Sequence, residues 1–151
     1  MNREEIVRRL RRYLPAILEK QPIQLAYLYG SVARDEITPF SDIDIALVGE
    51  RAFSPHERLD LMLNIALEVE DRCGLQDVDV RVINDAPLLL QGRVVTEGIL
   101  LYARSDSERV RYETATRMRY FDYLPIHQRL RNAFLANVRE QGLYYGRSRS
   151  R

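Results

Sequence analysis

Length and composition are those of an ordinary globular chain. The 151 residues suffice for one domain with its own core, and 46% hydrophobic and 30% charged side chains exclude a disordered or fibrous chain. The apolar stretches are short and broken by charge, and the first residues lack a signal-peptide pattern, so we expect a cytoplasmic protein without a membrane span. The single cysteine, Cys73, has no sequence partner for a disulfide, and we interpret it as structural.

Charge is distributed unevenly along the chain. Residues 1–103 carry 12 basic and 17 acidic side chains, whereas residues 104–151 carry 11 and 5. A basic segment of this kind can meet an acidic protein surface or a polyanion, but a solvated helix face is the more common explanation. We therefore expect no direct binding of nucleic acid.

Hydrophobic periodicity predicts the elements of the first half. Apolar side chains at helical spacing predict a helix over 3–19, which Pro22 ends. Residues 24–29 have the pattern of a buried strand that ends at Gly30, and residues 31–39 have room for one or two helical turns. Residues 42–48 alternate as a strand that places Asp42 and Asp44 on one face.

The second half is predicted to be mainly helical. Ser54 and Glu57 form a capping box for a helix over 55–72, which ends before a glycine. Its predicted buried stripe consists of Leu59, Met62, Ile65, Ala66 and Val69. Residues 77–82 alternate as a strand, and Asn84 or Asp85 is expected to cap a helix over 87–97 that leads into the apolar run 99–102. A helix over 105–123, interrupted by Pro125, and a final helix over 128–139 precede an end that we expect to be loose.

The segment from Gly30 to Asp44 carries the strongest chemical signal. A strand ends at Gly30, which permits close backbone approach, and Ser31 begins a helical turn whose free N–H groups suit a phosphate. Two aspartates at i and i+2 on a strand, Asp42 and Asp44, direct both carboxylates to one face, where they can share Mg²⁺. Arg34 lies three residues after Ser31 and can reach a polyphosphate.

A third carboxylate is needed on a neighbouring strand. Either Asp77 or Asp79 supplies it, and the residues alone leave both open. Arg81 continues the same face, where it either contacts phosphate or pairs with a carboxylate. Two metal ions held in this way would favour nucleotidyl transfer, because they neutralise charge on the α-phosphate and acidify the attacking hydroxyl. His56 and His127 have no partners at metal-ligand spacing, and we interpret both as structural.

Gly30-Ser31 followed by Asp42-x-Asp44 resembles the signature of the DNA polymerase β-like nucleotidyltransferases. The short length and the segment Val78-Asp79-Val80 resemble the minimal nucleotidyltransferases, or MNT proteins, over residues 1–103. The resemblance implies an α/β (α+β) fold with a small mixed sheet flanked by helices. It also implies a nucleotidyltransferase core over 1–103, a helical extension over 104–140 packed on or beside it, and a flexible tail over 141–151.

The resemblance further implies roles for the site residues. Gly30, Ser31 and Arg34 would hold the phosphates of ATP, Asp42 and Asp44 would hold two Mg²⁺, and Asp79 would be the third carboxylate. Members of the family commonly act as antitoxins beside a HEPN-domain ribonuclease toxin, and some attach AMP to a tyrosine of that toxin. A HEPN toxin is thus the expected acceptor and partner, in a hetero-oligomer with this chain.

Two other functions remain open. Nucleotidyltransferases that modify aminoglycosides share these motifs, but they usually carry a longer helical domain than the 48 residues that follow the core here. Alternatively, the chain is a non-catalytic antitoxin that covers a toxin through its basic tail and the tyrosines near it. Those tyrosines are Tyr112, Tyr120, Tyr123, Tyr144 and Tyr145. Catalysis is favoured because all the expected acidic positions and the serine are present.

Overall fold

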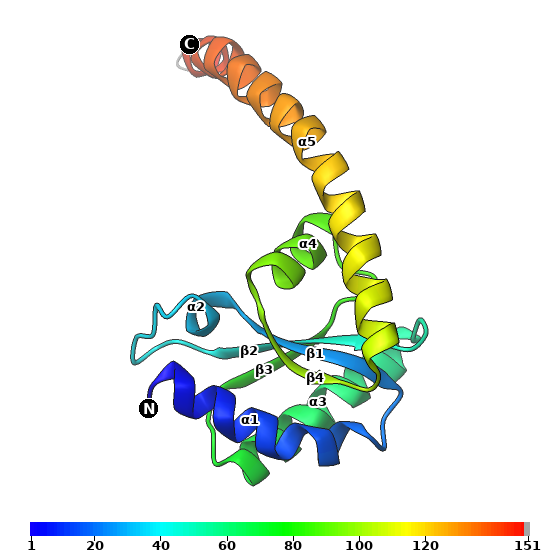
Figure 1. Ribbon diagram of the computed structural model, residues 1–151. Coiled ribbons are helices and arrows are strands. Elements are labelled where there is room, and N and C mark those ends of the chain that lie inside the picture. Colours follow the sequence, from blue (N-terminus) through cyan, green and yellow to red (C-terminus); the bar gives the residue numbers. More distant parts are fainter. Residues whose placement is uncertain (150–151) are drawn as a thin grey trace. The chain divides into compact units, whose positions relative to one another are not determined.

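Four strands form one mixed sheet in the order β3-β2-β1-β4 (Figure 1). The strands are β1 (Ile23–Tyr29), β2 (Ile43–Gly49), β3 (Val78–Val82) and β4 (Ile99–Ala103). Strand β1 pairs antiparallel with β2 and β4, whereas β2 and β3 run parallel. This computed structural model describes the backbone of residues 1–149 and the side chains of residues 1–141. The predicted α/β fold with a small mixed sheet is confirmed.

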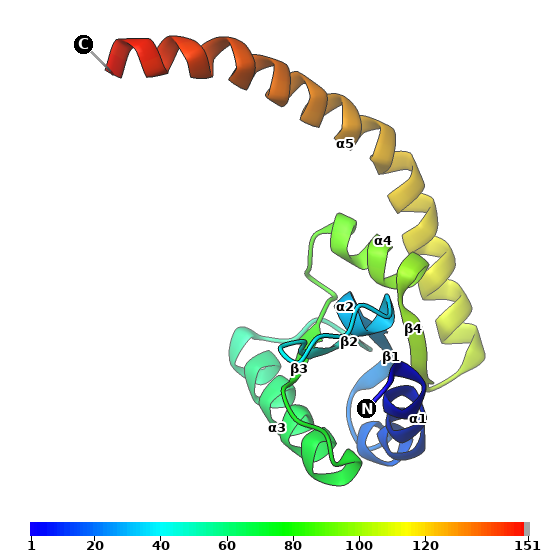
Figure 2. The ribbon, with the colours of Figure 1, turned by 90° about the vertical axis from the view of Figure 1, so that its left-hand side faces the viewer.

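Helices α1 (Arg3–Leu18) and α3 (Pro55–Cys73) lie side by side against one face of the sheet (Figure 2). The main hydrophobic core lies here, and α3 contributes Ile65, Val69 and Cys73 to it. Met62 and Ala66 are only partly buried, and Leu59 is 50% exposed, so the predicted stripe is wrong at its N-terminal end. The buried stripe of α3 is narrower than predicted. The Cys73 thiol is buried and lies 3.8 Å from the Arg9 carbonyl oxygen.

The opposite face of the sheet carries helix α4 (Leu88–Glu97) and the first turns of helix α5 (Asp106–Arg149) (Figure 1). Val94 of α4 packs in the second hydrophobic cluster with β-strand residues such as Ala46 and Val48. The Tyr27 hydroxyl donates a buried hydrogen bond of 2.7 Å to Glu113 of α5, whose other carboxylate oxygen pairs with Arg109 at 3.0 Å. On the same face, Asp79 and Arg81 of β3 remain exposed.

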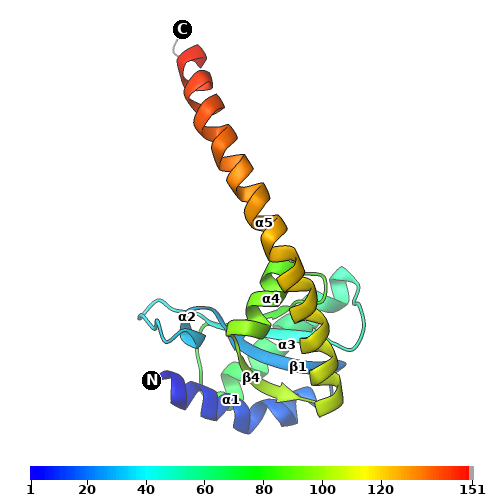
Figure 3. The ribbon, with the colours of Figure 1, turned by 45° about the horizontal axis from the view of Figure 1, so that its top comes forward.

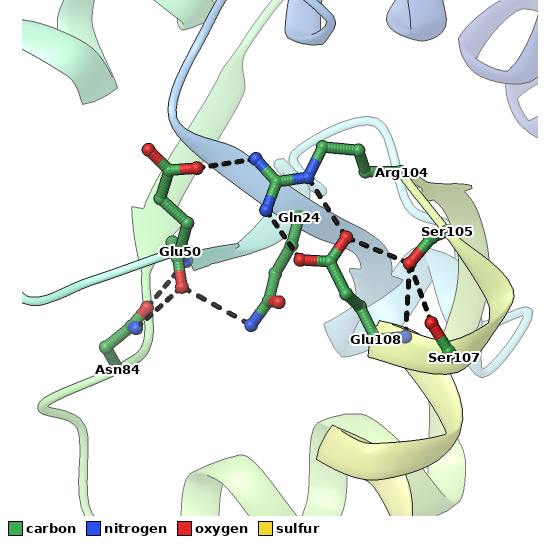
Figure 4. A network of polar contacts seen from close by, with 8 residues as sticks. Gln24, Glu50, Asn84, Arg104, Ser105, Ser107 and Glu108 are labelled. Carbon is green, nitrogen blue, oxygen red and sulfur yellow. Dashed lines mark hydrogen bonds and ion pairs between the residues drawn. The ribbon is translucent and has the colours of Figure 1, made fainter.

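A polar network joins the segments that follow β2, β3 and β4 (Figure 4). Arg104 joins Glu50, at 2.6 Å, to Glu108 in the first turn of α5. The Asn84 side chain accepts a hydrogen bond from the Gly49 N–H at 2.7 Å and donates one to the Gly49 carbonyl at 3.0 Å. Asn84 therefore joins the end of β2 and does not cap α4, whose N-cap, Pro87, makes no side-chain cap bond.

Helix α5 runs without a break from Asp106 to Arg149, so the predicted interruption at Pro125 and the separate helix over 128–139 are wrong. A proline inside a helix removes one backbone hydrogen bond and bends the axis, and here the helix continues beyond it. Of the expected loose end over 141–151, the side chains of residues 142–149 lie outside the described part, and residues 150 and 151 are outside it entirely.

The chain divides into two compact units, Met1–Arg117 and Met118–Arg151. The first unit contains the sheet, helices α1 to α4 and the first turns of α5. Among the described residues, no helix is long and apolar enough to cross a membrane. The one-turn helix α2 (Gly30–Ala33) lies at the open end of the sheet near the start of α1 (Figure 3), where Arg3 donates a hydrogen bond of 3.1 Å to the Ala33 carbonyl.

Candidate active site

Strand pairing brings two of the predicted carboxylates together. In the parallel ladder of β2 and β3, Asp44 is the direct register partner of Asp79, and in the antiparallel ladder with β1 it is the partner of Tyr29. Paired residues in adjacent strands point to the same face of a sheet. Asp44 is half-buried and Asp79 is exposed, so the two carboxylates share a face but differ in their access to solvent.

The third aspartate of the predicted group, Asp42, lies immediately before β2. The strand begins at Ile43, so the prediction of a strand from Asp42 onward is one residue too long and Asp42 is exposed in a loop. Its carboxylate is nevertheless close enough to Asp44 to act on it electrostatically. The charges of Asp42 and Asp79 thus both act on the Asp44 carboxylate, one from a loop and one from the neighbouring strand.

The pKa of Asp44 depends on the charged groups around it. Burial raises the pKa of Asp44, and the negative charges of Asp79 and Asp42 raise it further, whereas Arg34 lowers it. Such like-charge crowding is the condition that a hard cation with oxygen ligands relieves. In the part of the chain that the structure describes, no three His, Cys, Asp or Glu side chains are already arranged as a metal site. The donor set fits Mg²⁺ in chemistry, and Asp79 and Asp42 are exposed side chains with room to turn.

Asp77 does not share this arrangement. Its φ of 57° places it in the left-handed region, just before β3 begins at Val78. Its carbonyl oxygen accepts a hydrogen bond of 2.9 Å from the Ile43 N–H and so starts the parallel ladder. The predicted strand therefore begins one residue later than expected, and the ladder puts Asp79 rather than Asp77 opposite Asp44.

The Gly30 turn packs directly on the Asp44 carboxylate. Gly30 has a φ of 75°, and a Cβ built on it would collide with Oδ2 of Asp44. The positive φ therefore favours glycine here, and any side chain at this position would displace the Asp44 carboxylate. Ser31 follows, half-buried in the single turn of α2, and its carbonyl accepts a hydrogen bond of 2.8 Å from the Glu36 N–H. The predicted phosphate-binding turn thus lies against the Asp44 carboxylate.

A pocket of about 210 Å³ opens beside this turn. It contains the predicted Arg34 and a residue that the sequence did not single out, Arg93 of α4. Arg34 also pairs with Glu36 at 3.2 Å. The complete lining consists of Tyr29, Gly30, Ala33, Arg34, Leu90, Arg93, Val94, Glu97 and Gly98. An arginine on an amphipathic helix is ordinary in a sequence, so no signal marked Arg93.

Tyr29 is the second residue that sequence reasoning missed. Burial raises the pKa of the Tyr29 hydroxyl, Asp44 raises it further, and Arg81 lowers it through charge and a hydrogen bond. Arg81 therefore lies near the Tyr29 hydroxyl, on the same face of the sheet as Asp44 and Asp79. The alternation of β1, in which Leu25, Tyr27 and Tyr29 share one face, was a usable signal.

Comparisons with known proteins point to one family. The family model described as Polymerase beta, Nucleotidyltransferase matches residues 13–107. A relative from Methanocaldococcus jannaschii, named "Putative protein adenylyltransferase MJ0435", is 32% identical over 99 residues, which are 66% of this chain and 97% of the relative.

Solved structures of toxin-antitoxin complexes share the fold. A structure of a tri-AMPylated Shewanella oneidensis HEPN toxin in complex with MNT antitoxin matches with a TM-score of 0.61 and 23% identity, covering 87% of this chain and 98% of that chain. A toxin-antitoxin structure with AMP-PNP matches with a TM-score of 0.59 and 24% identity, covering 91% and 98%. The family match, which covers residues 13–107, shows that the chain belongs to the polymerase beta nucleotidyltransferase family.

Proposed function

We propose that this nucleotidyltransferase is an antitoxin that transfers AMP from ATP to a tyrosine hydroxyl of a cognate HEPN toxin and thereby neutralises it. The observation that carries the proposal is the pairing of Asp44 with Asp79 on the sheet face where the Gly30 turn packs. The family membership supports the reaction class, and the MNT antitoxins among the structural neighbours support the acceptor.

In the proposed reaction, the tyrosine oxygen attacks the α-phosphorus and the bond to pyrophosphate breaks. Asp42, Asp44 and Asp79 would hold two Mg²⁺, which when bound neutralise charge on the phosphates. Asp79 is exposed on the edge strand β3, so an incoming hydroxyl can reach it and give up its proton to it. Ser31 and Arg34 would orient the donor phosphates so that pyrophosphate leaves away from the acceptor.

A protein partner is supported by the second compact unit. Within residues 118–141, several large apolar side chains of α5 are exposed to solvent. They are Met118, Phe121, Ile126, Leu130, Phe134, Leu135 and Val138. Exposed apolar side chains at this density are typical of a protein–protein contact surface. This observation also favours a second candidate, an antitoxin that acts by binding alone.

The test is the intact mass of a HEPN protein encoded beside this chain's gene, after incubation with this protein, ATP and Mg²⁺. We expect the HEPN protein to gain one or more AMP units. An Asp42→Asn/Asp44→Asn variant serves as the inactive control, and Asp85→Asn, which removes an exposed aspartate paired with Arg58, is the matched control that should retain activity. Transfer by the double variant would contradict the carboxylate assignment. Tight complex formation without transfer by the wild type would favour the binding-only antitoxin.

A further inference from the structure

Two separate parts of the chain form the walls of the pocket beside the Gly30 turn. One wall is the end of β1 and α2, including Gly30 and Arg34, and the other is the face of α4 that carries Leu90, Arg93 and Val94. Its volume of about 210 Å³ is below the roughly 300–1,000 Å³ of a site for a drug-sized ligand. The pocket therefore suits a part of a nucleotide rather than a whole one.

The two arginines of the pocket differ in their partners. Arg34 pairs with Glu36 and lowers the pKa of Asp44, so it lies between the pocket and the carboxylates. Arg93 is exposed, and none of the hydrogen bonds or ion pairs between described residues involves it. Glu97 lies one turn further along α4 and lines the same pocket. A guanidinium without a protein partner at a pocket wall has all its N–H donors available for a ligand.

We propose that Arg93 binds the terminal phosphates of the donor nucleotide and thereby makes the site select a triphosphate over a monophosphate. The inference rests on the proposed function. In the proposed function the carboxylates would hold the α-phosphate beside Asp44, and Gly30, which packs on that carboxylate, also lines the pocket. The β- and γ-phosphates then extend into the pocket between Arg34 and Arg93, where planar guanidinium groups bind phosphate oxygens in pairs.

This placement also gives Arg93 a part in the departure of pyrophosphate. When the bond between the α-phosphorus and its bridging oxygen breaks, the negative charge that develops stays on the pyrophosphate. A guanidinium already on that group stabilises the charge without reorganising. Glu97 places an opposing negative charge in the same pocket, which weakens the hold on pyrophosphate and favours its release.

The competing occupant of the pocket is the nucleobase, because Leu90, Val94 and Tyr29 offer apolar surface. The two occupants predict different binding patterns. If phosphates lie there, the loss of Arg93 weakens a triphosphate and leaves a monophosphate unaffected. If the base lies there, changes in the pocket weaken both nucleotides equally.

The experiment is isothermal titration of the full chain with AMP-PNP and with AMP in the presence of Mg²⁺, which needs no acceptor. We expect Arg93→Ala to weaken AMP-PNP roughly 10- to 100-fold and AMP less than about twofold. Arg93→Lys should retain part of the affinity, and Glu97→Gln should strengthen AMP-PNP. Arg72→Ala, which removes an exposed arginine at the end of α3, is the matched control and should change neither affinity.

Circular dichroism and urea unfolding confirm that each variant is folded. An unchanged AMP-PNP affinity in folded Arg93→Ala overturns the inference while leaving the proposed function intact. An equal loss for AMP-PNP and AMP also overturns it and assigns the pocket to the base. If the wild-type protein binds neither nucleotide, the proposed function and this inference both fail.

Discussion

Replacing Gly30 with alanine should separate catalysis from stability. Gly30 has a φ of 75°, and Gly74, at the end of α3, has a φ of 64°, so alanine is strained at both positions. An L-residue in the left-handed region costs about 1–2 kcal/mol of folding free energy. A Cβ at Gly74 would meet only the Arg9 guanidinium at 3.3 Å, whereas a Cβ at Gly30 would collide with the end of the Asp44 side chain. Gly74→Ala is therefore the matched control.

The collision at Gly30 is relieved by rotation of the half-buried Asp44 carboxylate, so it adds little to the unfolding free energy. We expect both variants to lose about 1–2 kcal/mol in urea unfolding of the metal-free protein. A displacement of a catalytic group by about 1 Å costs roughly 100-fold in rate, so AMP transfer should fall by about that factor in Gly30→Ala and remain near wild type in Gly74→Ala. Near-wild-type transfer by Gly30→Ala would refute the reasoning, and so would equal losses of transfer in the two variants.

Three further outcomes follow from the site and the core. Asp79→Asn should lose more transfer than Asp77→Asn in the mass assay, because Asp79 is the register partner of Asp44; the reverse order would move the third carboxylate to Asp77. Because the pKa of Asp44 is raised in the folded state, its contribution to stability is present at low pH and is lost as pH rises through that pKa. Metal-free Asp44→Asn should therefore be more stable than wild type in urea at pH 7 and not below about pH 3.8, and equal midpoints at pH 7 would contradict this. Burial raises the pKa of the Cys73 thiol, so it should react with a disulfide reagent slowly until the protein is unfolded, and rapid reaction of the native protein would argue against the packing of α3.

The sequence predicted the elements of the first unit well, since each has a clear local period. It could not predict the order or direction of the strands, because pairing joins segments far apart in the chain and the alternation of one strand carries no information about its neighbour. The ends of the strands could not be predicted exactly, because they too depend on pairing with distant segments. Asp42 and Asp77 both alternate with their strands, yet the β2–β3 ladder begins after them. Asn84 has the chemistry of a helix cap, but the carbonyl and N–H of Gly49 are its partners.

The candidate site was predictable where its residues lie close in sequence, as in the run from Gly30 to Asp44. Arg93 was not, because its place in the pocket depends on how α4 packs against β1 and α2. Helix α5 was predicted to break because Pro125 has a strong local penalty. A single lost hydrogen bond did not outweigh the bonds of the residues on either side.

The second half of α5 has consequences for how long the protein survives. Residues 118–141 are helical and mostly exposed, and most of the stability of a helix in a protein comes from the packing of one face. Segments of this kind open locally at little cost in free energy and are where proteases cut first. A partner that covers the segment would shield it from cleavage. The turnover of this chain would then depend on how much partner is present, so an excess of free copies would be removed while bound copies persist.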